Sequence, residues 1–125
     1  WYTKPHILQK ISDYKGNILV KNKYDLTEKI NITEETMNII KHSLRKVVTS
    51  GTAKKAGLKE LLVAGKTGTT QTAIDDENHA WFVGYAPFES PKYCFVVVVE
   101  HTKGHGAAVA GPIVREILTQ SESSL

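Results

Sequence analysis

The chain has 125 residues, of which 41% are hydrophobic and 23% are charged, and its formal net charge is +3. These values are ordinary for one soluble globular domain or part of one. The basic residues are scattered rather than clustered, which argues against nucleic-acid binding, and the longest apolar run, Phe95 to Val99, is much too short to span a bilayer.

The N-terminal half is predicted to form a hairpin followed by a helix. Two short strands are expected over His6–Ile11 and Asn17–Lys21, around a turn that contains glycine. A polar connector follows. The helix is predicted to open at Thr33 as its N-cap and to end at Gly51. Helical spacing gives it one apolar stripe, formed by Met37, Ile40, Leu44, Val47 and Val48.

The C-terminal half is predicted to form three strands and a helix. The segment "AGKTGTTQ" is expected to be extended, because threonine favours strands and the two glycines disfavour a helix. The runs "HAWFVGYAP" and "KYCFVVVVE" flank the turn "FESPK" and indicate an antiparallel hairpin. In the terminal helix, Pro112 is expected either to lie in the first turns or to bend the helix. Four of its residues have the spacing for burial: Val109, Ile113, Ile117 and Leu118. The predicted fold class is therefore α+β, an antiparallel sheet covered by a C-terminal helix.

The stretch "VAGKTGTTQ" surrounds one lysine with glycines and threonines. The P-loop pattern also ends in G-K-T, the residues found here from Gly65 to Thr67. It needs a glycine five positions before Gly65, however, where this sequence has Glu60. A P-loop also opens a helix on its lysine and threonine, and this segment would start a helix badly. An ordinary strand with a solvated lysine stays open as an interpretation.

An acyl-transfer site is the third interpretation of this stretch. On an extended strand Thr67 and Thr69 point to one face, while Gly68 leaves the backbone approachable. Two hydroxyls and the nearby ammonium of Lys66 can hold a substrate carboxylate. A backbone N–H of the same strand can supply half of an oxyanion hole.

Several further motifs accompany K-T-G: "GTAKKAG" before it, then "HAWFVGYAP", "VVVVEH", a glycine-rich loop and "GPIVREIL". Their order and spacing over nearly the whole chain resemble one family. Residues 1–125 are identified as the C-terminal portion of the transpeptidase domain of class B penicillin-binding proteins. Within that class they are most similar to the elongation-specific enzymes of the penicillin-binding protein 2 type.

The resemblance implies a serine-type peptidoglycan D,D-transpeptidase that cross-links the cell wall and has neither a cofactor nor a metal. It implies that Lys66 takes part in catalysis by bridging toward a serine of an S-x-N motif. Thr67, Gly68 and Thr69 would bind the carboxylate of the terminal D-alanine of a stem peptide, or of a β-lactam. The Thr69 N–H would be an oxyanion donor. The parent protein would work with the elongation machinery at the periplasmic face of the bacterial inner membrane, although this chain has no membrane segment.

The nucleophile of that family is not evident in this sequence. S-x-x-K occurs as Ser12 to Lys15, which straddles the predicted hairpin turn, and as Ser43 to Lys46, which lies in mid-helix close before K-T-G. No S-x-N occurs. We therefore expect the chain to form no covalent adduct with a fluorescent penicillin. The alternative, from another functional class, is a non-catalytic interaction module that retains the penicillin-binding fold.

The resemblance also implies that the strand Tyr93–Glu100 normally pairs with an N-terminal strand that this chain lacks. An unpaired apolar edge favours pairing with another chain, so we expect a homodimer or a swapped assembly. The only cysteine, Cys94, is expected to be a buried thiol on this strand.

The sequence contains three further groups of candidate site residues: aromatic residues, histidines and a glycine-containing loop. Trp81, Phe82 and Tyr85 are expected to be core and cross-strand residues rather than ligand stackers. His79, His101, His105 and Glu100 fit no familiar metal-ligand spacing, and His79 and His101 are expected near opposite strand ends, so structural or solvated histidines are favoured. The loop Lys103–Gly106 is expected to be a flexible turn rather than a phosphate nest.

Overall fold

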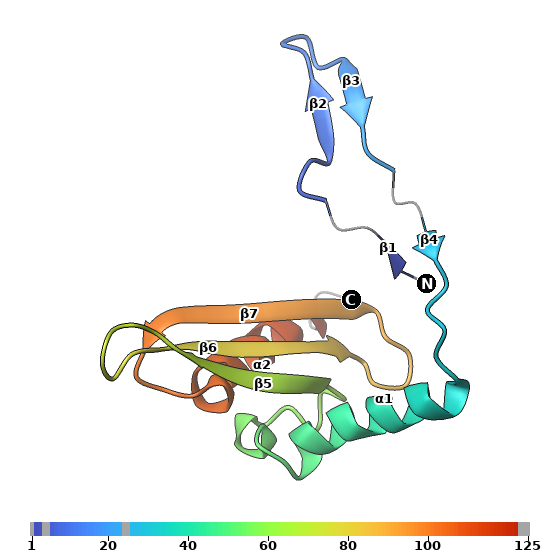
Figure 1. Cartoon of the computed structure of the whole chain (residues 1–125). Helices are drawn as coiled ribbons and strands as arrows, with labels where there is room; N and C mark the ends of the chain where they lie inside the picture. The colour runs from blue at the N-terminus through green and yellow to red at the C-terminus, as the bar shows by residue number, and fades with distance from the viewer. Residues whose placement is uncertain (1, 4–5, 24–25, 123–125) are drawn as a thin grey trace. The chain divides into compact units, whose positions relative to one another are not determined.

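A computed structural model describes residues 2–3, 6–23 and 26–122 of the chain (Figure 1). The chain divides into two compact units, Trp1–Glu34 and Glu35–Leu125, and each is described by itself. The elements are β1 (Tyr2–Thr3), β2 (Lys10–Ser12), β3 (Ile18–Lys21), β4 (Leu26–Glu28), α1 (Glu34–Thr49), the 3-10 turn η1 (Lys54–Ala56), β5 (Ala64–Gln71), β6 (Asn78–Ala86), β7 (Tyr93–Thr102) and α2 (Gly106–Glu122).

The N-terminal unit consists of two small antiparallel pairs, β1 with β4 and β2 with β3. The predicted hairpin is confirmed, but its first strand begins at Lys10 rather than His6, and the segment predicted as a connector contains β4. Asp13 closes the turn by accepting hydrogen bonds from the backbone N–H groups of Lys15 and Asn17, both at 2.9 Å. The side chain of Asn17 also donates to Asp13, and these bonds lower the pKa of the Asp13 carboxyl.

Helix α1 begins directly after Thr33 and ends before Gly51, as the sequence predicts. The Gly51 N–H donates to the carbonyl of Lys46 at 2.8 Å, which satisfies one of the last helical carbonyls. The predicted apolar stripe is buried only at its C-terminal end. Val48 is fully buried, whereas Ile40 is 42% exposed. Of the described residues of α1, only those in its last turns reach the hydrophobic core of the C-terminal unit.

The C-terminal unit is built on a three-stranded antiparallel sheet in the order β5-β6-β7. Helix α2 packs on one face of this sheet and lies behind it in Figure 1. The hydrophobic core between them contains Phe82 from the central strand and Val114 from α2, with Leu58 and Val63 from the segment before β5. The α+β prediction, with an antiparallel sheet covered by the C-terminal helix, is confirmed.

Leu118 of α2 is buried as predicted, but the rest of the buried face differs by one position from the predicted one. Ala110, Val114 and Leu118 are buried at a spacing of four residues. Ile113 and Ile117, which were expected inside, are 40% and 52% exposed. Helix α2 and η1 are in contact through small residues. At Gly111 the helix comes so close that an added Cβ would lie 2.5 Å from the Cβ of Ala56.

Side chains of the sheet alternate between the α2 face and the opposite face, which we call the open face. Phe95 and Val97 pack against the core, so the neighbouring Cys94, Val96 and Val98 lie on the open face. The prediction of a buried Cys94 is therefore wrong: its thiol is exposed. On β6, the predicted core residue Phe82 is buried, whereas Trp81 is 38% exposed and lies opposite Gly68 and Val98.

Candidate functional site

Strand β5 carries the K-T-G residues and forms one edge of the sheet, so half of its backbone groups have no strand partner among the described residues. The Thr72 N–H donates to the carbonyl of Glu77, and this pair continues the β5–β6 register. Because bonded positions alternate along an antiparallel strand, Lys66, Gly68 and Thr70 bond toward β6. The N–H and C=O groups of Thr67 and Thr69 therefore point to the free edge.

Lys66 occupies this free edge with its ammonium group. Its side chain starts on the open face, because it lies opposite Val83, and its Nζ donates to the carbonyl of Thr67 at 2.6 Å. This bond agrees with an outward-pointing Thr67 carbonyl. The Lys66 side chain is exposed, so its charge is available to a ligand that approaches the edge.

Thr67 and Thr69 carry their hydroxyls on the other face of the strand, as the alternation predicts. They lie opposite Phe82 and Ala80, which are buried against α2. The free edge is therefore lined by two hydroxyls from one side and by an ammonium from the other, with the Thr67 and Thr69 N–H groups between them. Such a set of donors suits a small carboxylate or a developing oxyanion.

Each hydroxyl has a partner that sequence analysis missed. The Thr67 Oγ1 lies 3.0 Å from the Oγ1 of Thr52, which comes from the loop after α1. The Thr69 Oγ1 accepts a hydrogen bond from the N–H of Gly106 at 3.3 Å. Thr52 belongs to "GTAKKAG" and Gly106 ends the glycine-rich loop, so both lay within the accompanying motifs, although no spacing rule connects them to β5.

Gly106 explains how the start of α2 reaches the strand. A Cβ at this position would lie 2.4 Å from the carbonyl oxygen of Gly68 and 2.5 Å from that of Trp81. Only glycine permits this approach, and the resulting contact brings the Gly106 N–H to Thr69. The loop predicted as a flexible turn thus ends in a residue that is hydrogen-bonded to the K-T-G strand.

The two S-x-x-K matches lie on elements other than the K-T-G strand. Ser12 ends β2 and belongs to the N-terminal unit, and its lysine, Lys15, lies in the hairpin turn. Ser43 lies in the middle of α1 with an exposed side chain. Neither serine is placed at the start of a helix, in agreement with the sequence analysis.

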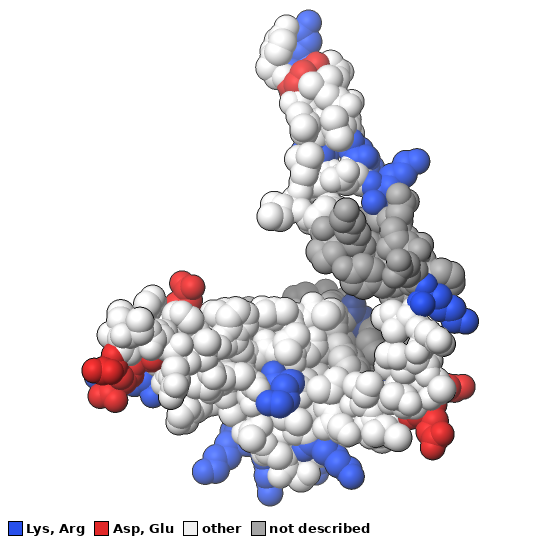
Figure 2. All heavy atoms as spheres, in the orientation of Figure 1, with Lys and Arg blue, Asp and Glu red and all other residues white. Residues whose placement is uncertain are grey.

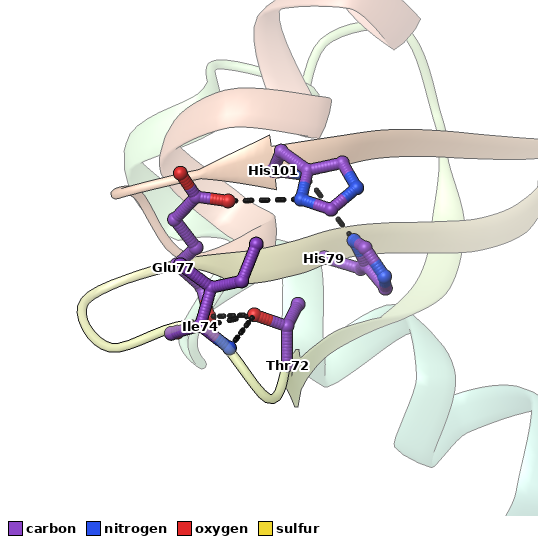
Figure 3. Close-up of polar contacts among 5 residues, drawn as sticks. All are labelled: Thr72, Ile74, Glu77, His79 and His101. Carbon is purple, nitrogen blue, oxygen red and sulfur yellow. Dashed lines mark hydrogen bonds and ion pairs between the residues drawn. The ribbon is translucent and has the colours of Figure 1, made fainter.

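His79 and His101 lie at the start of β6 and the end of β7, near opposite strand ends as predicted, and are neighbours in space (Figure 3). In an antiparallel hairpin the start of β6 meets the end of β7, and the two rings pack edge to face at 5.1 Å. The His101 N–H donates to Nδ1 of His79, and the His101 Nδ1 lies 2.8 Å from a carboxylate oxygen of Glu77. No group of three metal-ligating side chains gathers within residues 2–3, 6–23 and 26–122.

Charge is distributed unevenly over the C-terminal unit. Acidic side chains gather at the end where β5 and β6 are connected, and the rest of the sheet face in Figure 2 is largely uncharged. The acidic group consists of Asp75, Asp76 and Glu77. Tyr85 is the one described side chain in this unit with a raised pKa, because burial and the nearby Glu89 disfavour its ionised form. Within the residues that the structure describes, no helix is long and apolar enough to cross a membrane.

Known proteins are similar to this chain in both sequence and fold. Residues 1–119 match the family model "Penicillin binding protein transpeptidase domain". The chain is 35% identical to stage V sporulation protein D of Bacillus subtilis over 94% of its own length and 19% of the relative's. It is 34% identical to the peptidoglycan D,D-transpeptidase MrdA of Haemophilus influenzae over 55% of the chain and 13% of that relative.

Solved structures give the same result. The structure of PBP2 of Pseudomonas aeruginosa in complex with WCK 5153 matches with a TM-score of 0.64 and 30% identity, over 83% of this chain and 23% of that one. A D,D-transpeptidase domain from Eggerthella lenta matches with a TM-score of 0.64 and 27% identity, over 90% and 27%. The chain thus spans less than a third of these proteins. It belongs to the family of penicillin-binding protein transpeptidase domains, among relatives of class B.

Proposed function

We propose that the chain supplies the carboxylate-binding edge strand of a serine-type peptidoglycan D,D-transpeptidase. The single observation that carries this proposal is the β5 edge, where the Lys66 ammonium, the Thr67 and Thr69 hydroxyls and two outward N–H groups converge. These groups match in type and charge what a terminal D-alanine carboxylate, or the carboxylate of a β-lactam, requires. The family membership supports the same chemistry.

Each residue has a distinct part in the proposed site. Lys66 attracts the carboxylate and bridges toward the serine of an S-x-N motif in the parent protein, where it assists proton transfer. The Thr67 and Thr69 hydroxyls donate to the carboxylate oxygens. Gly68 keeps the strand accessible between them, and the outward N–H of Thr69 donates to the oxyanion of the tetrahedral intermediate. The acylated serine lies outside these residues.

In the parent protein we place this domain portion at the periplasmic face of the bacterial inner membrane, within the cell-wall elongation machinery. The naming of MrdA as a peptidoglycan D,D-transpeptidase and the PBP2 structural match support the cell-wall role on which this assignment depends. Penicillins and related β-lactams are then expected ligands of the whole domain. No nucleic acid is expected as a partner, since the +3 net charge is mild.

Labelling with a fluorescent penicillin tests the division of roles. The chain as it stands should give no covalent adduct, because neither Ser12, at the end of β2, nor Ser43, in the middle of α1, lies at the start of a helix. Stoichiometric labelling that is lost in Ser12→Ala or Ser43→Ala would contradict the proposal, since the chain would then carry its own nucleophile.

A non-catalytic interaction module is the second candidate function. It predicts that the full gene product carries no S-x-x-K and S-x-N motifs at positions that complete the site. Reading that sequence separates the two candidates, because a transpeptidase needs both motifs.

A further inference from the structure

Strand β7 contains a bulge near its end, where it lies beside the start of β6. The β6–β7 register shifts by one residue there, so that the single residue His79 lies opposite two residues of β7, Glu100 and His101. His101 has a φ of 51°, in the left-handed region that residues other than glycine seldom adopt. Bulges turn a strand and are frequent beside functional sites. A backbone held in this way needs support from its surroundings.

Two neighbouring side chains bond to His101 and supply this support (Figure 3). The backbone N–H of His101 donates to Nδ1 of His79 at 3.2 Å, and the ring Nδ1 of His101 lies 2.8 Å from a carboxylate oxygen of Glu77. Because an ionised carboxylate only accepts, the Nδ1 of His101 carries a proton. The Nδ1 of His79 is an acceptor, so it is unprotonated and the proton of this ring lies on Nε2.

The bulge lies directly before the loop that reaches the K-T-G strand. Thr102 ends β7, and its Oγ1 accepts a hydrogen bond from the N–H of Gly104 at 3.1 Å. The N–H of Gly106 then donates to Oγ1 of Thr69 at 3.3 Å. Only four residues lie between His101 and Gly106, so the direction in which β7 ends determines where Gly106 arrives. Since Thr69 accepts this bond, its own hydroxyl proton stays available to a ligand.

We propose that His79 is a positioning residue for the β5 site, an inference that rests on the proposed function for the identity of the ligand. Its unprotonated Nδ1 holds the bulge at His101, and the bulge holds Gly106 against the Thr69 hydroxyl. Histidine is the side chain whose charge ordinarily changes between about pH 5 and pH 8. Protonation of His79 sets its own Nδ1–H against the N–H of His101, so the bulge loses its support. Acid therefore weakens the contact between Gly106 and Thr69.

The titratable and charged groups near His79 come from the connections and strands around it. On β5 the residue opposite His79 is the uncharged Thr70, and α2 packs on the other face of the sheet. The β5–β6 connection, β7 and the loop after β7 contribute, in that order, Asp75, Asp76 and Glu77, Glu100 and His101, and Lys103 and His105. The carboxylates attract an imidazolium at His79, whereas a charged His101 ring repels it.

The two histidines respond to acid in opposite ways. Protonation of His101 leaves its Nδ1–H in place as a donor to Glu77, so this bond becomes a charged pair. Protonation of His79 removes an acceptor. Variants that change one group at a time therefore separate the two effects.

NMR of the ligand-free chain between about pH 8 and pH 5 tests the inference. Imidazole nitrogen signals should show His79 as the Nε2–H tautomer at the higher pH. Amide hydrogen exchange, corrected for its intrinsic rate at each pH, should show the N–H groups of His101 and Gly106 about tenfold less protected at the lower pH. His79→Asn keeps an acceptor oxygen near the place of Nδ1 but cannot be protonated, so its protection should be the same at both pH values.

Two further variants serve as controls. His105→Asn is the matched control, because it makes the same substitution at the histidine next to Gly106, whose side chain is exposed. It should keep the response to pH. Glu77→Gln should keep the response as well, since its amide oxygen still accepts from Nδ1 of His101 while the carboxylate charge is gone.

A second arm of the experiment connects the bulge to the ligand site. N-acetyl-D-alanyl-D-alanine should bind about threefold more weakly at the lower pH to the wild-type chain, and equally at both pH values to His79→Asn. Failure of this ligand to bind at either pH would contradict the proposed function alone, because the protection of Gly106 is measured without it.

Four results would overturn the inference itself. They are a His79 that carries its proton on Nδ1 at the higher pH, a response to pH that persists in His79→Asn, a response that is lost in His105→Asn, and a ligand affinity that ignores pH while Gly106 responds.

Discussion

Among the residues that the structure describes, the β5-β6-β7 sheet has two edge strands, which present the same kinds of backbone groups but different side chains. The β5 edge carries Lys66 and the hydroxyls of Thr67 and Thr69, whereas the β7 edge carries valines on its open face. Hydroxyls and an ammonium bind a small anion, while an apolar margin gains only when another strand removes it from water. The side chains therefore suit the β5 edge to a small anion and the β7 edge to apolar packing.

The largest loss of stability is expected in the central strand, because both edge strands depend on one of its residues. Phe82 is fully buried in the central strand and packs against Phe95 of β7 with a ring separation of 6.0 Å. Phe82→Ala should lower the free energy of unfolding by about 3–5 kcal/mol in urea denaturation. Trp81→Ala on the open face of the same strand is the control, at about 1 kcal/mol. Equal losses for the two variants would mean that α2 does not cover the face assigned to it.

A substitution with a smaller effect on stability should affect the β5 edge more than the β7 edge. In Gly106→Ala the new Cβ would meet the carbonyl oxygens of Gly68 and Trp81, so α2 must move away from β5. We expect a loss of about 1–3 kcal/mol in unfolding free energy and a shifted NMR signal for Thr69, with little change at Val96. Ala108→Ser, on the exposed side of α2, is the comparison. Equal shifts on β5 and β7 would show that the edges are not independent.

Much of this arrangement was predictable because it depends on local sequence. The K-T-G strand, the hairpin of aromatic and β-branched runs and the final helix follow from composition and period. The faces of single residues were harder to predict. Cys94 was placed inside because of its type, but its position next to Phe95, which packs on the core, puts it on the open face. Chemical type gives an average burial, and only the register of the strand determines the face.

Long-range contacts at the site could not be predicted from the sequence. Thr52 lies fifteen positions before Thr67 in the chain. The two hydroxyls are in contact only because the segment between α1 and β5, which contains η1, folds back toward the strand. The contact between Gly106 and Thr69 depends on the close packing of α2 on the sheet. Both contacts join segments that are distant in the chain, and a pattern with a fixed period carries no information about such pairs.

The smallest effect tests the Thr52 contact. Thr52→Val removes its hydroxyl but keeps its shape, and should cost about 0.5 kcal/mol of stability, since the contact is exposed. Its effect on ligand binding should be larger than its effect on stability, because the Thr67 hydroxyl loses its orientation. Thr70→Val, on the other face of β5, is the matched control. Equal binding by both variants would show that Thr52 does not orient Thr67.

The central claim is that the β5 edge binds a carboxylate, and an NMR titration with N-acetyl-D-alanyl-D-alanine tests it most directly. The account predicts saturable shifts centred on the amides of Thr67 and Thr69, which Lys66→Met strongly weakens while the fold is kept. Shifts centred on β7, or shifts at β5 that persist unchanged in Lys66→Met, would contradict the claim.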